Sequence, residues 1–216
     1  MNGERQEGFG LMDTTIFNGK RQSTSVTYIH PIKHRSNLEI LTNVTVNKIL
    51  FENKKAVGVE CKANGANKKY FSSKEVLLSA GAINSPQLLM LSGIGPENEL
   101  SKYSIEPVEC LEGVGKNLQD HLETYVQYKC KKPVTLHSAQ NPLKMALIGA
   151  EWFLFKTGVA AHSNLETGGF VRSNEMSDYP NIQFHFFPSL VLDHGRKSST
   201  CHAFQAHVGP MRPTSR

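Results

Sequence analysis

The sequence predicts an α/β unit followed by an α+β unit. Three observations predict this: a run of short strands over residues 36–79, a glycine-marked strand-to-helix junction at Gly81, and alternating strands that return after a helix at 142–156. With 216 residues, 39% of them hydrophobic, the chain is long enough for one large domain or two small ones. We place the boundary near residue 120, which gives domains at 1–120 and 121–216.

The first part begins with a series of predicted strands, at residues 38–41, 44–51, 56–61, 69–71 and 75–79. Apolar and polar residues alternate from Val44 to Leu50, as expected for a half-buried strand. The segments 52–54 and 63–67 contain asparagine, lysine and glycine, which are typical of hairpin turns. The pattern therefore predicts a compact β unit.

A change of pattern at Gly81 indicates a strand that leads into a helix. Ser85 as N-cap and Pro86 at the first helical position predict the helix start, and Gly93 predicts its end. Glycine lets backbone approach a ligand closely, and a helix start offers free N–H groups to an anion such as a pyrophosphate. A glycine-kinked junction without a ligand would have the same physical features, so both alternatives stay open at this point.

The second part combines loops, one helix and antiparallel strands. Glycines interrupt any period between residues 96 and 130, which predicts a loop-rich region. Residues 142–156 resemble a single helix with one apolar stripe, formed by Leu143, Leu147, Ala150 and Leu154. Strands are predicted at residues 169–172, 182–187 and 203–208.

Composition and spacing argue against several other classes of protein. The net charge of +5 comes from scattered lysines and arginines, and no nucleic-acid motif accompanies them. The four cysteines form no CxxC pair, which favours a reducing compartment over a disulfide scaffold. The sequence has no apolar run of about 20 residues, the length needed to span a bilayer. The polar residues 1–7 are typical of neither a signal peptide nor a transit sequence.

Four histidines, at positions 121, 185, 194 and 207, invite a catalytic or metal-binding interpretation. Their spacing fits no metal-ligand motif, so we expect no metal site. Structural roles are the better interpretation for His121 and His207.

The segment Gly81–Gly95 resembles the second signature of the glucose-methanol-choline (GMC) oxidoreductases. Further segments resemble the same family in the same order, at residues 19–24, 35–38, 44–46, 56–60 and 113–121. The resemblance therefore covers essentially the whole chain. Three strings in the more variable second part favour the choline-oxidising members of the family, at residues 136–140, 165–170 and 193–197.

The resemblance implies FAD as cofactor, bound in an α/β domain that corresponds to residues 1–120. Val46 matches the position whose backbone meets the adenine end of FAD, although packing would explain its side chain equally well. Ala80, Gly81 and Asn117 are the other residues expected near FAD. Residues 121–216 would form part of a substrate domain with an antiparallel sheet.

For the substrate, the resemblance implies a small alcohol, with choline converted to betaine aldehyde by hydride transfer to the flavin. Glu166 matches the carboxylate that holds the cationic group of choline, and His194 lies in a string that resembles a substrate-cavity loop. A sugar or another alcohol is the alternative substrate.

Two parts of the family pattern are missing. The glycine-rich dinucleotide fingerprint of complete members is absent, and so is the carboxy-terminal segment with the catalytic histidine. We therefore expect an internal fragment that contains no catalytic residue and is inactive by itself. A catalytically silent product that acts as a binding module is the alternative from another class.

Family resemblance also implies a location in mitochondria at the inner membrane, although this chain contains no targeting segment. A membrane electron acceptor such as a quinone would then receive the electrons. Oxygen is the alternative acceptor, and the residues leave both open.

Overall fold

The computed structural model describes residues 3–165 and 167–213, except for the side chain of His194. The described residues form two compact units. We call residues 35–119 the central unit. The residues up to 34 and from 120 onward form the other, which we call the flanking unit.

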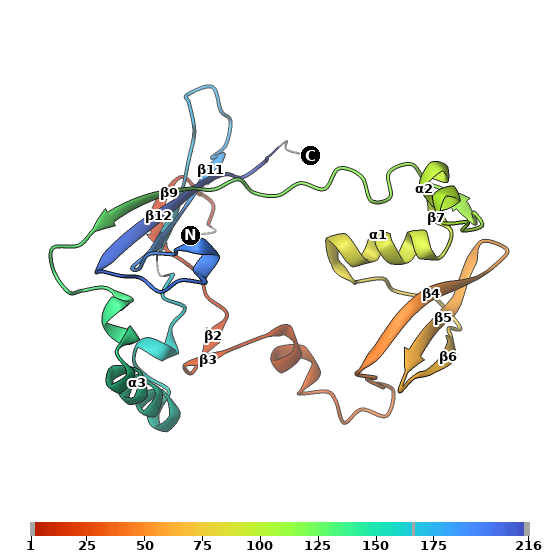
Figure 1. Ribbon diagram of the computed structural model, residues 1–216, viewed down its shortest axis with the longest axis horizontal. Helices are drawn as coiled ribbons and strands as arrows, with labels where there is room; N and C mark the ends of the chain where they lie inside the picture. The colour runs from red at the N-terminus through yellow and green to blue at the C-terminus, as the bar shows by residue number, and fades with distance from the viewer. Residues whose placement is uncertain (1–2, 166, 214–216) are drawn as a thin grey trace. The chain divides into compact units, whose positions relative to one another are not determined.

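The central unit consists of a three-stranded antiparallel sheet and two helices (Figure 1). The strand order is β4-β5-β6, so β4 is an edge strand. A short parallel pair, β7 with β8, lies next to helix α2 in the sequence. The elements are β4 (Val44–Glu52), β5 (Lys55–Ala63), β6 (Ala66–Phe71), α1 (Gly81–Leu91), β7 (Ile94–Gly95), α2 (Glu97–Lys102) and β8 (Glu109–Cys110).

Local sequence explains the hairpins of this sheet. Asn53, Lys54, Asn64 and Gly65 have positive φ, as the tight turns between β4, β5 and β6 require, and asparagine and glycine tolerate that conformation well. Buried side chains of β4 and β5, among them Ile49 and Cys61, form the core under the sheet. The predicted strands at 44–51, 56–61 and 69–71 are confirmed.

Two predicted strands of the central unit are wrong. Residues 38–41 and 75–79 are in no strand, although both are apolar. A strand needs a neighbour for its backbone N–H and C=O groups, and no described segment pairs with either one. Leu77 is accordingly 80% exposed.

The helix after the junction begins earlier than predicted. Its first residue is Gly81, with φ +87°, a conformation that glycine adopts without strain. Ser85 therefore lies inside α1, where its Oγ accepts a hydrogen bond from the Ala80 N–H at 3.1 Å. Pro86 also lies inside the helix and removes one donor from its first turns. The predicted end near Gly93 is confirmed, since α1 ends at Leu91 and Gly93 has φ +87°.

The flanking unit is built on a five-stranded antiparallel sheet with the order β1-β10-β11-β12-β9 (Figure 1). Its strands are β1 (Gly8–Leu11), β9 (Thr124–Lys129), β10 (Thr167–Val171), β11 (Ile182–Phe187) and β12 (Ala203–Pro210). A small hairpin is formed by β2 (Ile16–Phe17) and β3 (Lys20–Arg21). The described helices are η1 (Ser25–Ile29), η2 (Leu136–Gln140), α3 (Pro142–Phe155), η3 (Val159–Ala161) and η4 (Asp193–Gly195).

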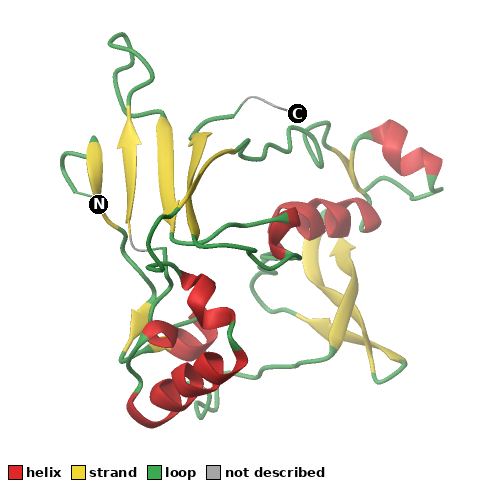
Figure 2. Ribbon diagram, turned by 60° about the vertical axis from the view of Figure 1, so that its left-hand side comes forward, coloured by secondary structure: helices red, strands yellow, loops and turns green. Residues whose placement is uncertain are grey.

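Helix α3 agrees with the predicted helix at 142–156, and Figure 2 shows it as a continuous helix. Asn141 caps its start, because Oδ1 accepts hydrogen bonds from the backbone N–H groups of Leu143 and Lys144. Trp152 ties the helix to the β2–β3 turn through a 2.6 Å hydrogen bond from Nε1 to Gly19 O. The predicted apolar stripe is exposed, with Leu143 72% accessible.

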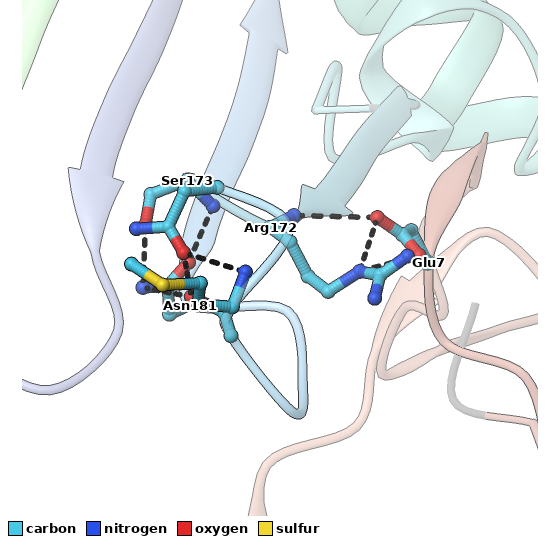
Figure 3. A network of polar contacts seen from close by, with 7 residues as sticks. Glu7, Arg172, Ser173 and Asn181 are labelled. Atoms are coloured by element: carbon cyan, nitrogen blue, oxygen red, sulfur yellow. Dashed lines mark hydrogen bonds and ion pairs between the residues drawn. The ribbon is translucent and has the colours of Figure 1, made fainter.

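The edge strand β1 joins β10 across a long sequence separation. Beside this pair, Glu7 accepts hydrogen bonds from Nε of Arg172 at 3.1 Å and from its backbone N–H at 3.4 Å (Figure 3). The hairpin between β10 and β11 is closed by Asn181, whose side chain bonds to the N–H and Oγ of Ser173 (Figure 3).

The α/β plus α+β fold class is therefore confirmed, with two differences in detail. Residues up to 34 belong to the same unit as residues from 120 onward, because β1 pairs with β10, whereas the predicted boundary near residue 120 grouped them with residues 35–119. The region predicted as loop-rich contains helix α2 and strand β9. Within the part of the chain that the structure describes, we find no helix with the length and hydrophobicity needed to traverse a bilayer.

Candidate functional site

The main candidate site is a hollow of about 580 Å³ in the central unit, between β4 and one side of α1. Its walls come from one edge strand, the extended segment before Gly81 and one side of α1. Most of the lining is apolar, and four polar side chains project among the apolar ones. The lining residues are Val44, Thr45, Val46, Ile49, Val59, Val76, Leu77, Leu78, Ser79, Ala80, Asn84, Gln87, Leu88 and Leu91.

Two of the predicted site residues, Val46 and Ala80, come together in this hollow. Val46 lies on β4 opposite Cys61 of β5, and its side chain is 39% exposed. Cys61, its cross-strand neighbour, is buried, and burial raises the pKa of the Cys61 thiol, so this cysteine stays protonated and packs as an apolar side chain.

The hollow is held together by a buried serine. Ser92 is fully buried, and its Oγ accepts a hydrogen bond from the Ile49 N–H at 2.8 Å and donates one to Leu88 O at 2.6 Å. The hydroxyl thus links edge strand β4 to the end of α1. No pattern in the sequence predicts this role, because a serine after a helix is ordinarily exposed.

Gly81 lies next to Ala80 and opens α1. Apart from its neighbours in the chain and the backbone of its own helix, no described atom would lie within 4 Å of a Cβ at Gly81, so the space beside this backbone is open. No side chain caps the start of α1, which leaves backbone N–H groups of its first turn available to an anion.

Asn117 lines a second hollow of about 580 Å³, which shares Gln87 of α1 with the first. Its backbone has φ +59°, a conformation that asparagine tolerates better than most residues. The other walls of this hollow come from α1, with Pro86 and Met90 among them, and from residues 115–119. The structure therefore places Val46 with Ala80 and places Asn117 in a different hollow.

The two residues predicted to bind substrate are described only in part or not at all. Glu166 lies outside the described residues. The backbone of His194 lies in η4, in the connection between β11 and β12, and its side chain is not described.

A polar cluster on the sheet of the flanking unit was not predicted as a unit. The Glu123 carboxylate lies between two histidines. His207 Nδ1 is 3.0 Å from Glu123 Oε2, and His185 Nδ1 is 3.8 Å from Glu123 Oε1. Tyr125 packs against the His207 ring with 4.5 Å between centroids. The cross-strand register, which pairs His185 with His207, brings these residues together, and spacing along the sequence could not reveal it.

The grouping of possible metal ligands can be followed among the described side chains. Across residues 3–165 and 167–213, no three His, Cys, Asp or Glu side chains are grouped so that they could hold a metal ion.

Comparison of the sequence with known proteins gives consistent relatives. A family model described as GMC oxidoreductase matches residues 1–123. The mitochondrial choline dehydrogenase of Homo sapiens is 56% identical over all 216 residues, and the oxygen-dependent choline dehydrogenase of Staphylococcus xylosus is 51% identical. The chain spans 36% of the length of the first and 38% of the second.

Comparison with solved structures supports the fold. A formate oxidase of Aspergillus oryzae RIB40 aligns with a TM-score of 0.87 over 97% of this chain and 41% of its own, at 22% identity. A pyridoxine 4-oxidase from Mesorbium loti aligns with a TM-score of 0.77 over 97% of this chain and 37% of its own, at 23% identity. At these identities, the likeness concerns the fold alone.

Proposed function

Because this chain belongs to the GMC oxidoreductase family, we propose that it is part of an FAD-dependent enzyme that oxidises choline to betaine aldehyde. The observation that carries the proposal is the 56% identity to a choline dehydrogenase, which continues through the flanking unit as well as the central unit. The bacterial relative named as an oxygen-dependent choline dehydrogenase, at 51% identity, supports the same substrate.

We propose that FAD lies along the central unit, at the hollow between β4 and α1. The residues there suit a nucleotide: an apolar floor suits an adenine ring, and the open backbone at Gly81 with the uncapped helix start suits a phosphate. Val46, Ala80 and Gly81 would contact the nucleotide half of FAD, and Asn117 would lie near the cofactor from the neighbouring hollow.

The alternation along β4 supports a backbone role for Val46. Ile49 donates its N–H to Ser92 rather than to β5, so its backbone polar groups face the free edge of the sheet. Backbone groups alternate along a strand, and the bulge between Val46 and Lys48 shifts that alternation by one residue. We therefore expect Val46 to turn its N–H and C=O toward the same free edge, where the polar edge of an adenine could pair with them.

FAD, when bound, supplies the acceptor for the hydride that leaves the alcohol carbon. The residues of this chain would bind and orient: the central unit holds the cofactor, and the flanking unit contributes to the substrate cavity. We assign the removal of the hydroxyl proton to none of its nine histidines.

For the substrate, we propose that Glu166 recognises the trimethylammonium group of choline and that His194 lines the cavity. A quaternary nitrogen has no hydrogen to donate, so a protein holds it through a negative charge, aromatic faces or both. The string at residues 165–170 supplies a carboxylate and an aromatic ring.

The experiment is Glu166→Gln in the full-length enzyme, which preserves the size of the side chain and removes its charge. We expect the KM for choline to rise by at least about tenfold, because one favourable charge pair is lost. The KM for 3,3-dimethylbutanol, the uncharged isostere of choline, should change much less.

A matched control is Glu175→Gln, which removes the same charge from an exposed hairpin of the flanking unit. It should leave both KM values unchanged. Equal effects of Glu166→Gln on choline and on the isostere would contradict a cation-binding role and indicate a structural one.

We also propose a mitochondrial location, supported by the human and mouse relatives, which are named mitochondrial. Association with the inner membrane and transfer of electrons to an acceptor there complete this proposal. The bacterial relatives named oxygen-dependent make oxygen the acceptor to test against it.

A further inference from the structure

Gln205 is a fully buried polar residue on β12, the strand next to edge strand β9 of the flanking sheet. Its Oε1 accepts hydrogen bonds from the Val191 N–H at 2.8 Å and from Gln127 Nε2 at 3.0 Å. Its Nε2 contacts His207 Nε2. One side chain therefore connects strand β9, strand β12 and the connection between β11 and β12, which we call the 188–202 connection.

The orientation of this amide is determined by the backbone. A backbone N–H can only donate, so the atom of Gln205 that faces Val191 must be the oxygen. The other end of the amide is then the NH₂ group, which donates to His207 Nε2. His207 must present an unprotonated Nε2 there, and its proton is left on Nδ1, which faces Glu123 Oε2 at 3.0 Å.

The histidine is thus held between a donor and an acceptor. Three titratable groups face it: Glu123 and Tyr125 from the β9 segment, and His185 from β11. Glu123 can accept a hydrogen bond from Nδ1–H of His207, whereas the NH₂ group of Gln205 can accept none from Nε2. The neutral ring with its proton on Nδ1 is the form that satisfies every bond in this chain of contacts.

The same glutamine also anchors the 188–202 connection near its start. Pro188 O accepts a hydrogen bond from the Leu136 N–H at 3.0 Å, and Val191 is bound by Gln205 three residues later. Beyond these two anchors the chain forms η4, which contains His194, and returns through the bridge between Leu192 and Lys197.

We infer that Gln205 is a positioning residue that holds the 188–202 connection, here also called the His194 loop, in place and at the same time fixes His207 in its neutral Nδ1–H form. The inference rests on the proposed function in one respect, because that function makes the His194 loop a wall of the choline cavity. The two roles of the glutamine can be separated, because each depends on a different atom of its amide.

Two substitutions at this position separate the roles. Gln205→Glu keeps an oxygen for the Val191 N–H and replaces the donor to His207 by a second oxygen. His207 should then take up a proton on Nε2 and become an imidazolium between two carboxylates. Gln205→Met has a similar length and no polar atom, so it should release Val191. Gln183→Met is the matched control: Gln183 bonds to His185 on the same sheet, and no described backbone group of the loop bonds to it.

The test uses the full-length holoenzyme with three measurements: ¹⁵N spectra of labelled histidine, hydrogen exchange at the Val191 amide, and steady-state kinetics with choline. We expect Nδ1–H at His207 in the unchanged enzyme and protons on both ring nitrogens in Gln205→Glu. In Gln205→Met, we expect about tenfold faster exchange at Val191 and about a tenfold higher KM, with kcat within about twofold. The control should leave the His207 signals, the Val191 exchange rate and the KM unchanged, and its effect on the spectra should be confined to His185, whose contact with Gln183 it removes.

A proton on His207 Nε2 in the unchanged enzyme would overturn the inference. So would an unaltered Val191 exchange rate in Gln205→Met, or released Val191 with an unaltered KM. An unchanged enzyme that does not oxidise choline would contradict the proposed function instead, while the spectra and the exchange rates would still decide the role of Gln205.

Discussion

Removal of the Ser92 hydroxyl should loosen the strand that forms one wall of the candidate cofactor site. In Ser92→Ala, the Ile49 N–H loses its acceptor at 2.8 Å and stays buried, since Ile49 is 4% exposed and Ser92 is fully buried. A buried donor without a partner costs about 1–3 kcal/mol, and the loss of the second bond, to Leu88 O, adds little because that carbonyl also accepts the backbone N–H of Ser92. The missing oxygen leaves only a small cavity.

Hydrogen exchange of the full-length enzyme measures this effect locally. The free energy of opening for amides in β4 and β5 should fall by about 1–3 kcal/mol, which corresponds to roughly 5- to 150-fold faster exchange. Ser101→Ala is the control, because the Ser101 hydroxyl is exposed and donates only to the nearby Asn98 O. Exchange in β4 that differs by less than about 0.5 kcal/mol between Ser92→Ala and the control would refute the reasoning.

Two further predictions concern the sheets. Gly58→Ala should destabilise β5 and β6 by at least about 1–3 kcal/mol, because a Cβ there would lie 2.2 Å from Tyr70 O. Hydrogen exchange of the β5 and β6 amides measures this loss of stability. Gly113→Ala is the control and should have no such effect, because no described atom lies within 4 Å of a Cβ at Gly113. The hydrogen bond from Arg172 lowers the pKa of Glu7 in the folded chain. The ionised pair therefore stabilises the β1–β10 contact fully at any pH above the ordinary pKa of glutamate, and this stabilisation is lost as the pH falls through the lower pKa of the folded state. Exchange of β1 amides should therefore accelerate below about pH 4 in the unchanged chain. In Arg172→Met, the part of this acceleration that depends on the Glu7–Arg172 pair should be absent. A pH profile of β1 exchange that is the same with and without the substitution would contradict the prediction.

Much of the central unit could be predicted from the sequence, because its structure is local. Alternation in β4, positive-φ residues in the turns and the apolar segment after Gly81 act between residues that are near in sequence. The helix start was misplaced by five residues, since the freedom of Gly81 to adopt φ +87° outweighed the N-cap preference of Ser85. Strand β9 was missed although its threonine, valine and tyrosines are typical strand residues.

Of the predicted site residues, Val46 and Ala80 line one hollow and Asn117 lines another, and their role in binding FAD stays a prediction. So do the roles of Glu166 and His194. The resemblance to the family indicated these residues one by one along the chain, and only the structure showed which of them line the same hollow.

The sequence by itself determined the family, the local strands and helices, and the glycine junction, because each depends on residues within a few positions of one another. The tertiary structure decided the pairing of β1 with β10, the burial of Ser92 and Gln205, and the approach of His207 to Glu123. The Ile49–Ser92 hydrogen bond joins residues 43 apart, and the Glu7–Arg172 pair beside β1 and β10 joins residues 165 apart. No local pattern encodes which distant partner a strand edge or a buried amide will find, because many segments could satisfy the same hydrogen bonds and only the packed fold selects one.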